Sequence, residues 1–417
     1  MILGLTKSHL YPLPLVCDGS KGLQGEKMKQ ITSAPLVKKI MTEFARLTGL
    51  SPASSDPQRY LWTDAFAVCN FVGLYQEAGG KEFKDRAIQL VDQVHNVLGR
   101  HRQDDNRIGW ISGLSEQDGS LHPTKGGLRI GKQLKERTPT DPFNECLEWD
   151  RDGQYYHYLT KWMHALNRVT RVTRDFTYNR WAIELAKAAH SKFVYAPSSS
   201  GQKRMYWKMS IDLSYPLVPS MGVHDPLDGL VTYTQLQATA AEDPEQPTRD
   251  MKGETADMAD MCKGKSWATD DPLGIGGLLS DAFRVAQLMV KGYFAETDLL
   301  GNLQDASLVG LRAFARGDPL KLPADYRLAF RELGLSIGLG VVDRLLELFE
   351  RNRQTFGKDH DLAVRLKALK QYEALKEVIE SFWLKPECQE AESWIAHRHI
   401  NMVMLATSLS PDGYLKL

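Results

Sequence analysis

The fold is decided by residues 60–75, YLWTDAFAVCNFVGLY, which are apolar around almost the whole circumference of a helix. Only Thr63, Asp64 and Asn70 interrupt this pattern, so the segment predicts a helix buried on most sides. The next segment, EFKDRAIQLVDQVHNVL at 82–98, has one apolar stripe and one charged face, which predicts a helix with a solvent side. A buried inner helix next to a half-exposed outer helix is the unit that recurs along the chain.

The same alternation continues to the end of the sequence. Segments that are apolar nearly all round predict six inner helices, near 60–77, 154–171, 226–239, 275–291, 324–339 and 391–408. Segments with a charged face predict the outer helices near 35–48, 82–99, 177–193, 248–263, 296–315 and 341–382, and the last of these is expected to hold two helices broken near Gly357.

Six hairpins with buried and half-exposed members suit a closed double ring, because inner helices touch neighbours on every side while outer helices keep a solvent face. We therefore predict an all-α fold, an (α/α)6 toroid formed by residues 34–417 after an N-terminal extension of residues 1–33. A plain helical bundle or a solenoid of helix pairs would give a similar pattern, although no residue-level repeat of a solenoid is visible.

Two long insertions interrupt the helical pattern, at about 101–152 and 196–224. The first contains RIGWISGL and GGLRIGKQL around SEQDGSLHPTK, which predicts a β-hairpin or small sheet. The second contains the strand-like stretch KRMYWKMSIDLSYPLV at 203–218. Both lead into inner helices, so we expect them on one face of the ring, walling a central cleft.

Composition excludes several classes of function. The 417 residues include 52 Lys plus Arg and 52 Asp plus Glu, without long blocks of one sign, so nucleic acid and anionic membranes are not expected partners. Five cysteines without CxxC spacing suit reduced thiols, and the N-terminus lacks the pattern of a signal peptide. We expect a soluble cytoplasmic protein. Because no P-loop, HExxH or dinucleotide motif is present, no cofactor and no metal are expected.

Three carboxylates lie in five residues just before an aromatic inner helix: Glu148, Asp150 and Asp152. Helix capping would account for Asp152 or Asp150, but not for three acids among tryptophan and tyrosine rings. In the earlier stretch RYLWTDAF, Asp64 lies inside an apolar helix and needs a partner, which would be Arg59 or a sugar hydroxyl.

Two further helix entries carry polar groups of possible function. In MGVHDPLDGL at 221–230, Asp225 is a natural N-cap before Pro226, while His224 and Asp228 flank that cap. In WIAHRHINMVML at 394–405, His397 and His399 are two residues apart and point in different directions, which excludes a metal site made by both. Either histidine could transfer protons or have a structural role.

The alternating helices, together with RYLWTDAF, LEWDRDGQYYHYLTKW and HDPLDGL, resemble the six-hairpin glycosidase superfamily, whose (α/α)6 toroids include unsaturated glucuronyl hydrolases and N-acylglucosamine 2-epimerase relatives. The resemblance covers residue 35 to the end and implies a small-molecule carbohydrate substrate. Flat rings beside carboxylates also suit pyranose rings. We expect substrate contacts from Arg59, Trp62, Asp64, Tyr156, His157, Trp207, His397 and His399.

The chemistry that we expect first is glycoside hydrolysis, with one carboxyl as acid and a second as base or nucleophile. The catalytic candidates are Glu148, Asp150, Asp228 and His224. One alternative is a sugar epimerase or isomerase that uses His224 or His157 together with His399. Another is a toroid that binds carbohydrate without catalysis.

Overall fold

Helices dominate the computed structural model, which describes residues 33–417 except 198–200, 246–249, 295–296 and 357–359. The predicted N-terminal extension, apart from Ser33, and the predicted helix break at Gly357 lie outside the described residues.

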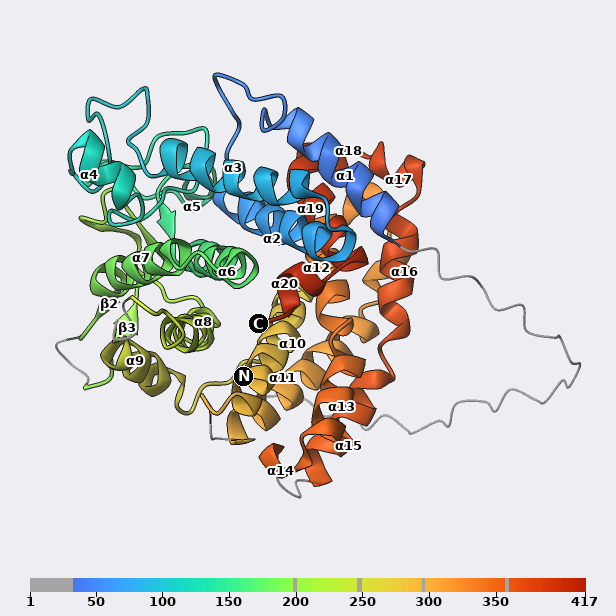
Figure 1. The fold of residues 1–417 in the computed structure, drawn as a ribbon. Coiled ribbons are helices and arrows are strands. Elements are labelled where there is room, and N and C mark those ends of the chain that lie inside the picture. Colours follow the sequence, from blue (N-terminus) through green and yellow to red (C-terminus); the bar gives the residue numbers. More distant parts are fainter. Residues whose placement is uncertain (1–32, 198–200, 246–249, 295–296, 357–359) are drawn as a thin grey trace, which may run out of the picture. The chain divides into compact units, whose positions relative to one another are not determined.

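Six helices form the inner wall of a closed ring, in which each packs against the next and the last packs against the first (Figure 1). Their burial follows from apolar side chains on every face, as in α2, where Leu61 to Leu74 are all buried. The inner helices are α2 (Leu61–Ala78), α6 (Tyr156–Thr173), α8 (Asp225–Ala240), α10 (Pro272–Val290), α12 (Ala329–Leu339) and α19 (Arg398–Leu409).

Outer helices cover this wall, and each of them has one buried stripe and one solvent side. They pair with inner helices as the predicted hairpins require: α1 with α2 and α19, α3 with α2, α7 with α6, α9 with α8, α11 with α10, and α16 with α12. Their bounds are α1 (Ala34–Leu47), α3 (Lys81–Leu98), α7 (Thr177–Phe193), α9 (Lys252–Cys262), α11 (Thr297–Arg316) and α16 (Ala374–Trp383). The prediction of an (α/α)6 toroid is confirmed.

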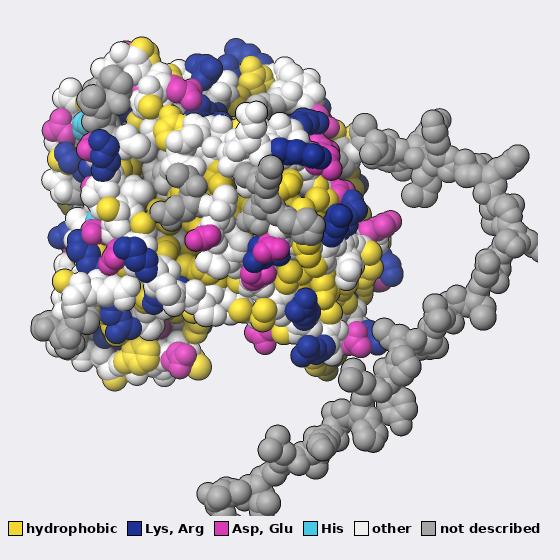
Figure 2. Space-filling view, turned by 90° about the horizontal axis from the view of Figure 1, so that it is seen from below, with side chains coloured by type: hydrophobic (Ala, Val, Ile, Leu, Met, Phe, Trp, Pro, Cys, Tyr) yellow, Lys and Arg dark blue, Asp and Glu magenta, His cyan; other side chains and the backbone are white. Residues whose placement is uncertain are grey.

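Helix α10 is long and apolar enough to cross a membrane by length and composition alone. Within the ring, however, 72% of that stretch is buried, because α10 packs against α8, α11 and α12. Its composition is therefore explained by its place in the inner wall. On the face drawn in Figure 2, basic and acidic side chains are interspersed, so that face carries no large area of one charge.

Two of the predicted inner helices are shorter than expected. Helix α12 begins only at Ala329, because residues 319–328 form two 3-10 turns, η1 (Pro319–Lys321) and η2 (Ala324–Tyr326). The predicted helix at 391–408 is divided at His397 into α18 (Glu392–Ala396) and α19. The remaining short helices are α13 (Val342–Arg351), α14 (Arg353–Phe356), α15 (His360–Lys370), α17 (Pro386–Gln389) and α20 (Asp412–Leu415).

The first insertion is not the predicted β-hairpin. Between 101 and 150 the structure describes two short helices, α4 (Glu116–Leu121) and α5 (Glu145–Asp150), and only isolated β-bridges. The Ser115 side chain caps α4, and the extended segment is held by a side chain instead of a partner strand, since the amide of Gln154 bonds the backbone of Leu128 and Gly126. In the same segment, the backbone N–H groups of Arg129 and Ile130 bond the backbone oxygens of Leu98 and Gly153, which lie outside the strands.

The second insertion contains strands, as predicted. Strand β4 (Lys208–Met209) lies between β1 (Gln154–Tyr155) and β5 (Pro216–Val218) in an antiparallel sheet, while β2 (Val194–Tyr195) pairs with β3 (Arg204–Met205). Because β1 leads directly into α6, this sheet joins both insertions at the start of an inner helix.

Candidate functional site

Aromatic rings from two inner helices and the second insertion meet where α6 begins. The ring centroids of Tyr155 and Trp207 are 5.1 Å apart, those of His157 and Tyr158 are 4.9 Å apart, and those of Trp62 and Tyr158 are 5.3 Å apart. Pairing of β1 with β4 fixes this arrangement, because it places the strand that follows Trp207 beside Tyr155. We call these five residues the aromatic cluster.

An acid and a base face each other at the edge of the aromatic cluster. His157 in the first turn of α6 and Asp225 in the first turn of α8 are mostly buried, and 3.7 Å separates Nδ1 of the imidazole from Oδ1 of the carboxyl group. This separation is too long for a hydrogen bond. Trp62 Nε1, His157 Nδ1 and Asp225 Oδ2 are all buried without a hydrogen-bond partner among the described residues. Buried polar atoms without partners are costly, and three together indicate a place where a ligand would supply the partners.

Burial also changes the protonation of this pair. It lowers the pKa of His157 to about 4. Burial, reinforced by the negative charge of Asp228, raises the pKa of Asp225 to about 8. At neutral pH the imidazole is therefore a neutral proton acceptor and the carboxylic acid a neutral proton donor. Acid and base groups with pKa values shifted in this way are typical of catalytic sites.

Below the pair, polar side chains of α6 and α8 continue toward the centre of the ring. Lys161, one turn after His157, donates a 2.7 Å hydrogen bond from Nζ to Oδ1 of Asp228. One turn further, the His164 and Gln235 side chains are 3.0 Å apart. Asp228 is thus held in a buried ion pair and is not a free carboxylate.

The carboxylates of the predicted helix entry are separated by the structure. Glu148 is buried, and its Oε1 accepts a 2.8 Å hydrogen bond from Arg137, while its backbone oxygen accepts one of 2.6 Å from Lys208. Asp152 is also buried and accepts from the backbone N–H of Gly131. Asp150 is exposed and has no hydrogen bond or ion pair within the described part of the chain. None of the three is the N-cap of α6, which is Tyr155.

Several other predicted site residues have structural partners. Asp64 is paired with Arg59 at 3.4 Å and accepts the Tyr60 N–H at 3.0 Å, which corresponds to the ion-pair alternative. His224 donates a 2.9 Å hydrogen bond from Nε2 to the backbone oxygen of Trp267, and the Tyr156 hydroxyl bonds Tyr233 at 2.8 Å. The remaining two histidines contact phenylalanine rings, Phe330 for His397 and Phe44 for His399.

The structure therefore brings together Trp62, His157 and Trp207, and Asp228 lies one helical turn after Asp225 on α8. The sequence predicted Asp225 as an N-cap, but the N-cap of α8 is His224 and no side-chain capping hydrogen bond is present. A signal for its role was its position in the first turn of an inner helix. Participation of these residues in a common site stays a prediction.

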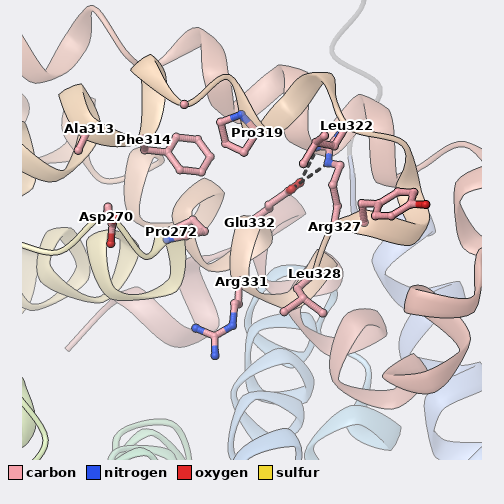
Figure 3. Close-up of a pocket in the computed structure, with 12 residues that line it drawn as sticks. Asp270, Pro272, Ala313, Phe314, Pro319, Leu322, Arg327, Leu328, Arg331 and Glu332 are labelled. Carbon is pink, nitrogen blue, oxygen red and sulfur yellow. Dashed lines mark hydrogen bonds and ion pairs between the residues drawn. The ribbon is translucent and has the colours of Figure 1, made fainter.

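A cavity of about 350 Å³ lies elsewhere, between the start of α10, the end of α11 and the start of α12 (Figure 3). None of the predicted site residues lines it. Its buried charged residues, Arg327 and Glu332, are already joined by two hydrogen bonds of 2.8 and 2.6 Å, drawn as dashed lines in the figure. A second cavity of about 340 Å³, at the first insertion, is lined by Arg107 and Glu136, which are paired at 2.5 Å. The paired charges leave neither cavity with a buried acid or base comparable to His157 and Asp225.

No cluster of three or more His, Cys, Asp or Glu side chains with the geometry of a metal site occurs in the described ranges. The four described cysteines, Cys69, Cys146, Cys262 and Cys388, are free thiols.

Six hairpins closed into a double ring make the described part of this chain an (α/α)6 toroid. No protein-family model and no curated protein matches the sequence. Solved structures of similar fold include a sugar epimerase from a ruminal bacterium, with 9% identity, a TM-score of 0.46, and coverage of 90% of this chain and 98% of that one.

Two cellobiose 2-epimerases are also similar in fold, each 11% identical and each matched over 90% of this chain. The enzyme from Spirochaeta thermophila DSM 6192 has a TM-score of 0.46 and is covered over 98% of its length. The enzyme from Bacillus thermoamylovorans B4167 has a TM-score of 0.43 and is covered over 99%.

Proposed function

We propose that the chain is a carbohydrate-active enzyme of the isomerase or epimerase kind, which moves a proton at the carbon next to the carbonyl group of a reducing sugar. The observation that carries this proposal is the His157–Asp225 pair, mostly buried beside four aromatic rings, with Nδ1 of His157 and Oδ2 of Asp225 unpartnered among the described residues. The aromatic rings would stack on the C–H face of a pyranose, while the unpartnered polar atoms would bond its hydroxyl and carbonyl oxygens.

The pair can carry a balanced proton transfer. Neutral His157 would take the proton from C2 of the open-chain aldose, while Asp225 would give its proton to the carbonyl oxygen at C1, forming an enediol. When His157 returns its proton to C1 and Asp225 takes the proton of the C2 hydroxyl, the product is a ketose. Return of a proton to the opposite face of C2 gives the epimer instead, and this outcome requires a second proton donor on that face.

Glycoside hydrolysis has less support from the geometry. It requires two carboxyl groups facing one bond, about 5 to 9.5 Å apart, with at least one of them free to ionise and act. Glu148 is held by Arg137 and Lys208, and Asp228 is held by Lys161. Of the carboxylates expected to catalyse hydrolysis, this leaves the exposed Asp150 without a second free partner.

The proposal is tested by incubating the purified chain with reducing sugars in D₂O and following deuterium at C2 by NMR. We expect exchange together with formation of the ketose or the C2 epimer, and a loss of about 10²–10⁴ in rate for His157→Gln and for Asp225→Asn. A matched control is His190→Gln, since His190 pairs with Asp257 at 3.0 Å on the outer helices α7 and α9. That variant should keep the wild-type rate.

Release of new reducing ends from oligosaccharides or of nitrophenol from aryl glycosides, without any exchange at C2, would contradict the proposal. So would equal exchange rates in wild type and His157→Gln. Thermal melts of each variant separate a loss of chemistry from a loss of folding.

A further inference from the structure

A half-exposed tryptophan extends the aromatic cluster outward. Trp149 on α5 is 48% exposed, and its ring meets the Trp207 ring edge-on at 5.0 Å. Trp207 in turn lies nearly parallel to the His157 ring, with an interplanar angle of 14° and centroids 6.1 Å apart. Three successive rings therefore lead from the surface to the buried acid and base.

Groups that can bond sugar hydroxyls stand beside these rings. The exposed carboxylate of Asp150 follows Trp149 directly and makes no hydrogen bond or ion pair among the described residues. The Lys132 ammonium lies 5.6 Å from the centre of the Tyr60 ring and is likewise without an ion-pair partner in the described ranges. Asp150 and Lys132 also interact electrostatically, and the Tyr60 hydroxyl bonds that of Tyr158 in the aromatic cluster at 2.8 Å.

Single exposed apolar side chains are common on protein surfaces, so the exposure of Trp149 alone indicates nothing. Here the ring is held edge-on by Trp207, and Trp207 is fixed by backbone hydrogen bonds to Tyr156 and Val218. A flat, half-exposed ring next to an exposed carboxylate is suited to stack on a pyranose and bond its hydroxyls.

We propose that Trp149, Trp207, Asp150 and Lys132 form an outer sugar-binding subsite, and that the substrate is an oligosaccharide of at least two units. This inference rests on the proposed function for the orientation of the substrate. The reducing unit would lie against the His157–Asp225 pair, and the next unit would stack on the exposed Trp149. A single sugar would fill only the inner position.

The test uses binding, which needs no turnover. Calorimetric titration of the full chain with glucose, maltose, cellobiose and lactose should show at least one disaccharide binding more tightly than glucose. Trp149→Ala should weaken that disaccharide by about tenfold and leave glucose unchanged, since stacking of one ring contributes on that order. Asp150→Asn should weaken the same disaccharide and spare glucose.

The matched control is Phe143→Ala, which removes a 55% exposed aromatic ring from the same insertion; this ring lies against the Arg137 guanidinium and is not part of the Trp149–Trp207–His157 series. It should bind every sugar as the wild type does. Trp149→Phe, which keeps a flat ring, should retain most of the preference for the disaccharide, and thermal melts report whether each variant folds.

Equal loss of glucose and disaccharide binding in Trp149→Ala, the same loss in Phe143→Ala, or no disaccharide binding more tightly than glucose would overturn the subsite. Tryptophan-dependent disaccharide binding without C2 exchange on any sugar would uphold the subsite and count against the proposed chemistry. C2 exchange that is as fast on glucose as on every disaccharide, and that is unaffected by Trp149→Ala, would support the proposed chemistry and contradict the proposed subsite.

Discussion

At the scale of single residues, the unusual feature is a buried histidine and a buried aspartic acid that are both uncharged at neutral pH. Burial produces both shifts, because it penalises whichever form carries charge. The same burial makes the pair costly to maintain, since Nδ1 of His157 and Oδ2 of Asp225 are buried without a hydrogen-bond partner among the described residues. A backbone hydrogen bond from Gly222 and the charge of Lys161 favour the ionised form of Asp225, but burial outweighs them and its pKa stays raised.

The shifted pKa of Asp225 gives the stability of the protein a particular pH dependence. The carboxyl group ionises near 4 in the unfolded chain but near 8 in the folded one, so between these values the folded state binds the extra proton and stability falls as pH rises. The slope approaches about 1.4 kcal/mol per pH unit at most. Asn cannot ionise, so Asp225→Asn should lack this slope.

Urea denaturation of both proteins between pH 5 and pH 8 measures the effect. The difference in unfolding free energy, wild type minus Asp225→Asn, should decrease steadily over this range. His157 acts in the opposite direction, since its folded pKa near 4 removes stability as pH falls below about 6.5. A pH-independent difference between wild type and Asp225→Asn would show that the carboxyl group is already ionised in the folded protein.

At the scale of elements, the inner helices α10 and α12 approach each other very closely. A Cβ placed on Gly276 would lie 2.0 Å from the backbone oxygen of Gly334, and one placed on Gly338 would lie 2.5 Å from Cα of Gly276. The two inner helices therefore touch backbone to backbone, and only glycine permits it. Any side chain at this contact would have to push the helices apart.

We expect Gly276→Ala to destabilise the fold by about 1–3 kcal/mol, the usual cost of overpacking a tight core. Gly277→Ala is the matched control, because the same substitution one residue later meets nothing within 4 Å. That variant should gain up to about 1 kcal/mol from the better helix propensity of alanine. Chemical denaturation of the two single variants gives both numbers, and similar effects in both would contradict the close contact.

The helices could be predicted from sequence because the spacing of apolar residues shows whether a helix is buried on one face or on all faces. The outer helix predicted at 177–193 has the same bounds in the structure. The first insertion could not be predicted, since its extended segment is held by the side chain of Gln154, a residue far along the chain. The local sequence pattern shows the apolar runs of this insertion, but it does not show which residues those runs contact.

The candidate site was accessible to sequence reasoning only in part. Trp62 and His157 were selected because acidic and aromatic residues gather at inner-helix entries. The pairing of Glu148 could not be predicted, because its partners Arg137 and Lys208 come from separate insertions. The meeting of His157 with Asp225 depends on how α6 packs against α8, and neither helix alone specifies it.

At the scale of the whole molecule, the last described helix occupies the centre of the ring. Helix α20 contacts α2, α6, α10 and α19, and lies in the middle of the inner wall in Figure 1. Its backbone oxygens accept hydrogen bonds from three inner-helix residues: Arg168 at 2.8 Å, His164 at 2.8 Å and Gln287 at 2.9 Å. The final segment of the sequence thus ties together helices that are far apart along the chain.

Tyr414 makes the central packing contact of this segment. It is 6% exposed, and its ring stacks on Phe66 at 4.6 Å and meets His164 edge-on at 5.1 Å. Since the ring bridges α2 and α6, Tyr414→Ala should lower the unfolding free energy by about 3–5 kcal/mol, as for other buried aromatic truncations. Tyr414→Phe keeps the ring and should lower the unfolding free energy far less.

The control is Tyr326→Ala, which removes a 78% exposed ring and should change stability by about 0.5 kcal/mol or less. Urea denaturation separates the possibilities: an unchanged midpoint for Tyr414→Ala would mean that the inner wall closes without this segment, whereas a lower midpoint with an unchanged denaturant slope would mean that the ring and its central helix unfold as one unit.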